Sequence, residues 1–334
     1  MSELLYAMLL VPVVAVLGII LGLFFNGIDR ILAARMQARI GPPVTQPFRD
    51  IRKLLLKETI VPTHAVKWLF NAMPLLSLAA AITILFFIPL AGFPPLLQGS
   101  GDLILLLYLL LFPSLALVIA GFASASPYAT VGAQREMVTM LSLELPLAIA
   151  AVSVAWLLST ALCGQAVFSL AVIAANPVWG LVGPFGFVGL AILFIAMLVV
   201  MPGELGSIPF DTAEAETEIA GGILVEYSGR NLALFYLADA VKTIAFASIT
   251  IALFLPYGIA AWLGLGGIAA AFANTLFFLL KLFVVVFVGR IFLRVAIPRL
   301  RITQVVKAFW GYATFAALLA LMLIIIDVAL RGVI

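Results

Sequence analysis

Long uncharged apolar runs limit what this 334-residue chain can fold into more than any other feature. No Asp, Glu, Lys or Arg occurs in Trp68–Gly101, Leu103–Gln134, Leu145–Gly203 or Thr243–Leu280. Each run exceeds the roughly 20 residues that a helix needs to cross a bilayer, and the third is long enough for two crossings. Only 10% of the residues are charged, against about 25% in soluble domains. We therefore expect an all-α integral membrane protein.

Hydropathy and the placement of charge predict eight transmembrane helices and one orientation. The expected spans are residues 4–26, 69–91, 103–123, 136–159, 185–203, 232–255, 271–293 and 308–328. Segments 29–67 and 294–307 are rich in Lys and Arg, and we expect Arg135 in the loop after the third span. The loops on the other side carry Asp102 as their only charge. Because Lys and Arg favour the cytoplasmic side, both termini should lie on the opposite, outer side of the membrane. We treat residues 1–334 as one membrane domain.

The segment 204–230 gathers acidic residues on the side predicted to be cytoplasmic. Six of the chain's fifteen Asp and Glu residues lie in it: Glu204, Asp211, Glu214, Glu216, Glu218 and Glu226. Clustered acids repel one another and need partners near a membrane. We therefore expect segments 29–67, 204–230 and 290–307 to meet at one cytoplasmic vestibule. The alternative is a solvated acidic loop.

The spacing within this segment also bears on function. If Asp211–Glu218 is helical, Asp211, Glu214 and Glu218 occur at i, i+3 and i+7 and share a face. Neighbouring carboxyl groups cannot all ionise, so such a row can pass protons by way of water. Pro209 and the pair Gly221–Gly222 argue against a continuous regular helix.

Glu144, in "LSLELPL", lies inside the fourth expected span. An intramembrane carboxylate is costly and indicates a functional site. Pro146 cannot donate a backbone hydrogen bond, which leaves a carbonyl one turn earlier free for water or ions. The alternative is a neutral structural Glu bonded to a neighbouring helix. At the end of the same helix, we expect Glu136 to form an interfacial ion pair with Arg135.

Three further ionisable residues lie in the later spans. Asp239 and Lys242 are spaced i, i+3 and can pair within one helix or belong to a proton relay. Lys281 has no acid near it in sequence. We expect Lys281 to face the bundle interior and to pair with Glu144 or Asp239.

Two further segments are predicted to have structural roles, one on the membrane surface and one at the end of the last helix. "QPFRDIRKLLLKE" forms an amphipathic helix with Phe48, Ile51, Leu54 and Leu55 on one face, as in helices that lie on the membrane surface. Asp327 and Arg331 are spaced i, i+4 at the outer end of the last helix. We expect this pair to have an anchoring role.

Four stretches, in order, resemble one family. They are "DRILAARMQARIGPP", "LSLELPL", "IPFDTAEAETEIAGGILVEYSG" and "LRVAIPRLRITQ". Together they look like the membrane subunit shared by respiratory complex I, its subunit 1, and the group 4 energy-converting nickel–iron hydrogenases. "GPP" stands where complex I relatives typically read "GPN", and "QPFRDIRKLLLKE" and "QREM" also resemble the hydrogenase branch. Leu143 stands where the family often has an aromatic residue. The alternative is complex I subunit 1, which contributes to a quinone chamber.

The resemblance implies a multi-pass subunit in the cytoplasmic membrane of a prokaryote, without a redox centre of its own. It would dock a hydrophilic arm and couple ferredoxin-linked hydrogenase electron transfer to proton or sodium translocation. The hydrogenase large and small subunits and an iron–sulfur subunit would hold the nickel–iron centre and the clusters, and antiporter-like membrane subunits would adjoin it. Cys163 and His64 are each the only residue of their type, which disfavours an iron–sulfur, haem or zinc site in this chain. No feature points to nucleic acid.

The resemblance also assigns residues to roles. The six acids of segment 204–230 would line the entrance of the translocation path, and Glu144 would lead inward. Asp239 and Lys281 complete the expected path. Docking or charge balance would fall to Arg35, Arg39, Arg294, Arg299 and Arg301.

Two other classes of protein compete with this interpretation. A stand-alone transporter often has two related halves, and no internal repeat is evident. A passive membrane anchor would explain the basic loops, but it would explain neither Glu144 nor the acidic segment.

Overall fold

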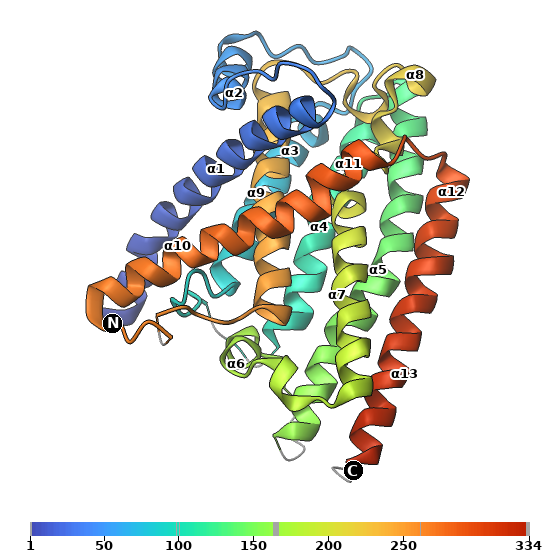
Figure 1. The fold of residues 1–334 in the computed structure, drawn as a ribbon. Coiled ribbons are helices and arrows are strands. Elements are labelled where there is room, and N and C mark those ends of the chain that lie inside the picture. Colours follow the sequence, from blue (N-terminus) through green and yellow to red (C-terminus); the bar gives the residue numbers. More distant parts are fainter. Residues whose placement is uncertain (1, 98, 100, 163–166, 261, 332–334) are drawn as a thin grey trace.

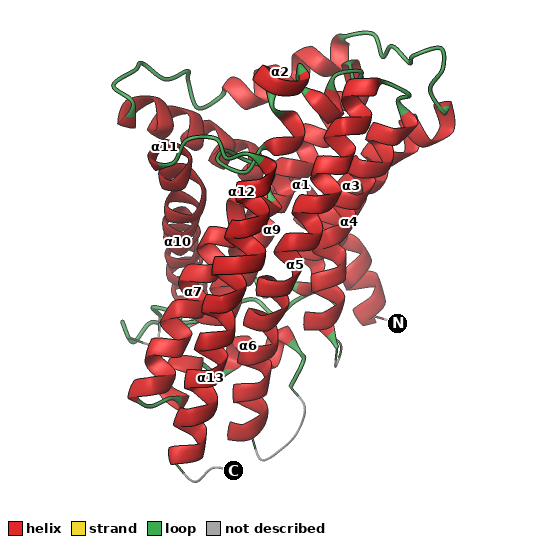
Figure 2. Cartoon of the chain, turned by 90° about the vertical axis from the view of Figure 1, so that its right-hand side faces the viewer, coloured by secondary structure: helices red, strands yellow, loops and turns green. Residues whose placement is uncertain are grey.

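The computed structural model describes residues 2–97, 99, 101–162, 167–260 and 262–331, and they form a bundle of helices (Figures 1 and 2). Eight helical stretches in this part of the chain are long and apolar enough to span a membrane, which confirms the predicted fold class. The main helices are α1 (Ser2–Met36), α3 (Lys67–Phe87), α4 (Asp102–Ala123), α5 (Pro127–Ala161), α7 (Pro184–Glu204), α9 (Gly229–Phe254), α10 (Gly267–Val286) and α13 (Thr314–Leu330). The shorter ones are α2 (Gln46–Leu56), α6 (Leu170–Ala175), α8 (Glu216–Ile219), α11 (Leu293–Ala296) and α12 (Ile302–Val306).

Several transmembrane helices extend beyond the residue ranges predicted for them from the sequence. α1 continues to Met36, and α5 begins at Pro127, a residue suited to the first turn of a helix. Arg135 therefore lies within α5, and its predicted place in a loop is wrong. The last two spans each contain a π-helical segment, Phe287–Phe292 after α10 and Lys307–Ala313 before α13. π-Helical segments are rare in proteins overall, and those that occur often lie at functional sites.

Helix α9 occupies the centre of the bundle (Figure 1). It packs against α1, α2, α3 and α10, and its second half is almost continuously buried. Small residues such as Ala240, Ala245 and Ala247 allow these neighbours to approach closely. The two ends of the described chain lie at the end of the bundle opposite α2 and α8 (Figures 1 and 2).

The amphipathic helix α2 forms as predicted, but its apolar face is directed at protein. Ile51 is buried, and Phe48 and Leu54 pack with it against Leu23 of α1 and Ala233 of α9. Leu55, expected on the same face, is exposed. The apolar stripe therefore attaches α2 to the bundle instead of leaving that face for lipid.

The predicted pair of Asp327 and Arg331 at the C-terminal end of α13 is confirmed. Arg331 Nε lies 3.3 Å from Asp327 Oδ2, and this carboxylate also accepts the backbone N–H of Gly183 at 2.7 Å. Gly183 immediately precedes α7, whose first N–H groups lack partners within the helix. The pair thus joins the end of α13 to the start of α7.

Close packing of α7 on α13 gives the first testable prediction. A Cβ atom at Gly189 of α7 would lie 2.7 Å from the carbonyl oxygen of Ala320 in α13. We expect Gly189→Ala to lower the free energy of unfolding by about 1–3 kcal/mol, because the two backbones must separate. Thermal unfolding in detergent measures this change. Gly311→Ala is the control, since a Cβ there meets no atom within 4 Å. Equal melting temperatures of the two variants would contradict the prediction.

Candidate functional site

A cavity of about 290 Å³ lies in the part of the bundle nearest α2 and α8. Helices α4, α5 and α9, the end of α7, the segment after it and the π-helical segment Phe287–Phe292 contribute to its walls. Its charged lining residues are Glu136, Glu204, Asp211, Glu214, Asp239, Lys242, Arg290 and Arg294. The predicted convergence of segment 204–230 with the basic segment at 290–307 is therefore confirmed.

Segment 204–230 is folded back against α5 by glycine. Gly221 and Gly222 have φ values of +91° and +53°, which only glycine adopts readily. A Cβ at Gly222 would lie 2.0 Å from the carbonyl oxygen of Ala213, and one at Gly132 of α5 would lie 2.8 Å from the same atom. The segment thus consists of short turns, Thr212–Glu214, Glu216–Ile219 and Gly222–Leu224, between α7 and α9.

This conformation overturns the predicted row of acids on one helical face. Asp211 pairs with Arg299 at 2.8 Å, and Glu218 pairs with Arg135 of α5. Glu214, between them in sequence, lines the cavity. Asp211 and Glu214 therefore face the cavity, whereas Glu218 is not among its described lining residues, because the segment Asp211–Glu218 contains a break in the helical backbone at Ala215.

The other acids of the segment separate into two groups. Glu204 lines the cavity and is buried. Glu216 is exposed, Glu226 is half-buried, and neither is among the described residues that line the cavity. The sequence predicted one acidic site, whereas the structure brings only Glu204, Asp211 and Glu214 of this segment to the cavity.

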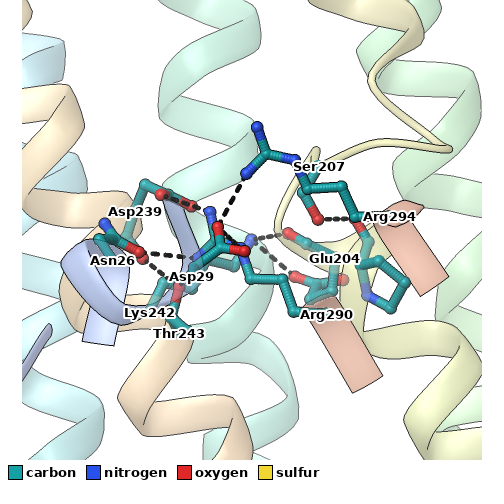
Figure 3. Close-up of polar contacts among 10 residues, drawn as sticks. Asn26, Asp29, Glu204, Ser207, Asp239, Lys242, Thr243, Arg290 and Arg294 are labelled. Atoms are coloured by element: carbon teal, nitrogen blue, oxygen red, sulfur yellow. Dashed lines mark hydrogen bonds and ion pairs between the residues drawn. The ribbon is translucent and has the colours of Figure 1, made fainter. Parts of the chain in front are cut away.

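Lys242 and Glu204 form a buried ion pair across the bundle (Figure 3). Lys242 Nζ lies 2.8 Å from Glu204 Oε1, and the two side chains are 5% and 6% exposed. The ammonium group also donates to the Glu204 carbonyl oxygen at 2.6 Å and to Ser114 Oγ at 2.8 Å. The predicted pairing of Lys242 with Asp239 is wrong, since the two side chains of α9 bond to different helices.

Arg290, in the first π-helical segment, connects α1, α9 and α10 (Figure 3). It donates to Asp239 at 3.2 Å, to Asn26 at 3.1 Å and to Thr243 at 2.5 Å. Its Nε lies 3.9 Å from Asp29 Oδ2, which also accepts from Arg294 Nη1 at 2.8 Å. Neither Arg290 nor Asp29 was proposed from the sequence as a site residue.

The sequence analysis also misplaced Glu136. It is 7% exposed and lines the cavity, where the Ser114 hydroxyl lies between Glu136 and Lys242. The expected pairing of Glu136 with Arg135 is wrong. Adjacent residues of a helix do not face each other, and this rule was the sequence signal that could have placed Glu136 inside.

Glu144 and Lys281 lie away from this cavity. Glu144 is half-buried on α5, eight residues after Glu136 and hence about 12 Å further along the helix. Lys281 Nζ donates to the carbonyl oxygens of Leu255 and Tyr257, at 2.7 and 2.8 Å. The expected pairing of Lys281 with Glu144 or Asp239 is wrong, because Lys281 lies at the opposite end of α9.

The five predicted docking arginines also differ in their surroundings. Arg294 and Arg299 neutralise Asp29 and Asp211. Exposed side chains are found for Arg35, Arg39 and Arg301. The first two therefore balance charge at the cavity, and the other three are open to a partner.

Charge counting indicates that the cavity holds protons at neutral pH. Its lining has five acids against three bases, and Asp29 and Arg299 at its border add one of each. Outside the spans, burial raises the pKa of Glu214 to about 8, with Asp239, Glu136 and Asp211 acting in the same direction and Arg299 opposing them. Burial also raises the pKa of Asp211, against Arg299 and Arg294. Glu214 is therefore a neutral acid at pH 7.

A second cavity of about 490 Å³ lies between α1, α2 and α9. It shares Tyr236, Asp239, Arg290 and Arg294 with the first cavity. The ion pair of Arg290 and Asp239 therefore lies on the wall that the two cavities share.

Eight candidate spans among the described residues, around a cavity lined by carboxyl groups, define a polytopic membrane protein. The profile of the NADH dehydrogenase family matches residues 8–325, and the chain belongs to this family.

Relatives of this chain are membrane subunits of energy-converting complexes. Hydrogenase-4 component C of Escherichia coli (strain K12) is 34% identical over 270 residues, which cover 81% of this chain and 82% of that protein. An NADH-quinone oxidoreductase subunit of Brevibacillus brevis is 31% identical, over 97% of this chain and 94% of that one. A chain in the structure of the membrane-bound sulfane sulfur reductase, an archaeal respiratory membrane complex, superposes with a TM-score of 0.80 at 29% identity. That match covers 97% of this chain and 100% of the other.

The titration of Glu214 gives a second prediction. The folded protein binds this proton more tightly than an unfolded chain with a pKa near 4.5, so the free energy of unfolding should fall as pH rises from about 4.5 through about 8. Infrared spectroscopy should show a carboxylic acid C=O band that disappears near pH 8 and is absent in Glu214→Gln. A band unchanged by the substitution would contradict the assignment.

The buried ion pair gives a third prediction. Lys242→Met leaves the Glu204 carboxylate buried beside no cation, and we expect it to cost about 3–5 kcal/mol of stability. The double variant Lys242→Met with Glu204→Gln should recover much of this loss, because no charge remains uncompensated. Unfolding of both variants in detergent measures the difference. Equal destabilisation would show that the pairing does not determine the cost.

Proposed function

We propose that this chain couples electron transfer in a docked hydrophilic arm to proton or sodium translocation across the cytoplasmic membrane of a prokaryote. The single observation that carries the proposal is the cavity with more acids than bases, in which Glu214 retains its proton at neutral pH. A group of this kind responds to a nearby change of charge by releasing or binding a proton.

The docking surface follows from the exposed arginines. Arg35, Arg39 and Arg301 are exposed, and segment 204–230, predicted to be cytoplasmic, reaches the cavity from the same side. In this proposal they bind an arm made of hydrogenase large and small subunits and an iron–sulfur subunit. The nickel–iron centre and the clusters would belong to those subunits. The 34% identity to Hydrogenase-4 component C supports the hydrogenase branch.

Each charged residue then has a distinct role in the mechanism. Glu214 and Glu136 hold and exchange protons within the cavity. Lys242 holds Glu204 in place, and Arg290 holds Asp239, so that the neighbouring charges stay fixed while a proton moves. A negative charge arriving in the docked arm raises the proton affinity of Glu214, and its removal lowers that affinity.

Onward transfer involves Glu144. It lies about two helical turns from Glu136 on α5 and is half-buried, so it has access to the side of the bundle. In this proposal Glu144 passes the change of charge to antiporter-like membrane subunits. Lys281 lies at the opposite end of the bundle and is not part of this proposed proton path. The chain acts as one membrane domain with both termini outside.

The second cavity favours one alternative function. Its lining combines apolar side chains such as Leu23 and Ile51 with a larger number of charged ones, Arg290 among them. A cavity with both kinds of lining can hold an amphiphile such as a quinone. The relative from Brevibacillus brevis, 31% identical to this chain, is a subunit of an oxidoreductase whose name includes that substrate class.

Four variants in the intact complex test the proposal and give the fourth prediction. We expect Glu214→Gln, Glu136→Gln and Glu144→Gln to abolish ion translocation in sealed vesicles, because each removes a proton-exchanging group. Glu216→Gln is the matched control, since Glu216 is an exposed acid of the same segment. Redox turnover and translocation are measured together with ferredoxin as donor. Translocation at the control level in all three variants would reject the mechanism. Turnover that requires an added quinone would select the alternative.

A further inference from the structure

A third cavity, of about 380 Å³, lies at the opposite end of the bundle from the acidic cavity. Its walls are the segment after α3, helix α6, the end of α9 and one face of α10. The lining is mostly apolar, and its polar side chains include Asn274 and Lys281 of α10. None of the described lining residues is acidic.

Lys281 carries a positive charge into this cavity without an acidic partner among the described residues. Its Nζ donates to the carbonyl oxygens of Leu255 and Tyr257, and it lies 5.1 Å from the centre of the Phe277 ring. Carbonyl oxygens and an aromatic face are both suitable partners for an ammonium group. An ammonium group has three N–H donors, and the two carbonyl oxygens accept from two of them. One donor remains for a ligand.

Asn274 supplies a second donor on the same face of α10. Its Oδ1 accepts the backbone N–H of Ala260 at 3.0 Å, which fixes the orientation of the side-chain amide. Its Nδ2 donates to no residue that the structure describes. Glycines bring the walls close to this amide, since Cβ atoms at Gly92 and Gly258 would lie 3.5 and 2.9 Å from its atoms.

The outer surface of α10 beside the cavity is suited to acyl chains. Phe272, Leu276 and Leu280 follow one another at i, i+4 and i+8 and are 72%, 61% and 57% exposed. Leu280 is adjacent to Lys281 in sequence but lies about 100° away around the helix, so the exposed stripe is on the surface next to the cavity and not inside it. Trp262, 88% exposed, lies in the segment before α10, and tryptophan is typical of the membrane–water interface.

We propose that this cavity binds the head group of an anionic phospholipid with a polar, hydroxyl-bearing head. The phosphate accepts from Lys281 Nζ, and an oxygen of the glycerol head accepts from Asn274 Nδ2. An acyl chain lies along Phe272, Leu276 and Leu280. The lipid thereby supplies the counter-charge of Lys281 and fills the space between the ends of α9 and α10.

The experiment uses the intact complex in phosphatidylcholine vesicles that contain a minor fraction of spin-labelled phosphatidylglycerol. Electron paramagnetic resonance measures the immobilised fraction of the label, with spin-labelled phosphatidylcholine as reference. We expect selective immobilisation of phosphatidylglycerol. Lys281→Met should reduce this selectivity about tenfold, the loss of one charge-assisted hydrogen bond. Lys281→Arg should retain it, because the charge remains.

Two further variants separate the site from general effects. Asn274→Asp keeps the acceptor for Ala260 but replaces the donor with a negative charge, so it should also lose selectivity. Lys67→Met is the matched control, because Lys67 is an exposed lysine at the start of α3. Three results would overturn the proposal: wild-type selectivity in both Lys281→Met and Asn274→Asp, equal immobilisation of the two lipids, or release of the label by soluble glycerol phosphate.

Discussion

The arrangement of charge in this protein depends on one constraint: a carboxyl group inside a membrane protein must be neutralised by a cation or by a proton. The cavity and its border contain more acids than bases, so cations alone do not satisfy it. Lys242 and Arg290 fix Glu204 and Asp239, whereas Glu214 remains neutral by holding a proton. The fixed pairs and the proton-holding acids therefore have different tasks, although they line the same space.

The backbone is shaped to meet this constraint. Gly221 and Gly222 allow the tight turns of the acidic segment, in which Glu214 and Asp239 line the same cavity. A π-helical segment places Arg290 between α1 and α9. α9 supplies Asp239 and Lys242 from one turn, and they pair with different neighbouring helices. Irregular backbone is tolerated at membrane depth when it lines a polar cavity, and here it lies where charge is concentrated.

The sequence was sufficient for the parts of the fold that depend on length and average polarity. Hydropathy and the placement of charge located all eight spans, and the distribution of Arg and Glu predicted that segment 204–230 would meet the basic segment near Arg294. Which charged residues form ion pairs with each other was not predictable in the same way. Spacing along one helix favoured Asp239 with Lys242, but the actual partners, Arg290 and Glu204, are distant in sequence. Such contacts depend on how helices pack, which a single sequence does not encode locally.

The relatives differ in the redox chemistry that their names state, while their similarity to this chain covers 81–97% of its length. A hydrogenase, an NADH-quinone oxidoreductase and a sulfane sulfur reductase are named for different reactions. What a subunit of this fold can contribute to each of them must therefore be independent of the acceptor. A buried group of acids that responds to charge at its basic face meets this requirement, because electrostatic coupling depends on the sign and distance of a charge and not on its chemical carrier. The same reasoning explains how one membrane subunit can serve several hydrophilic arms.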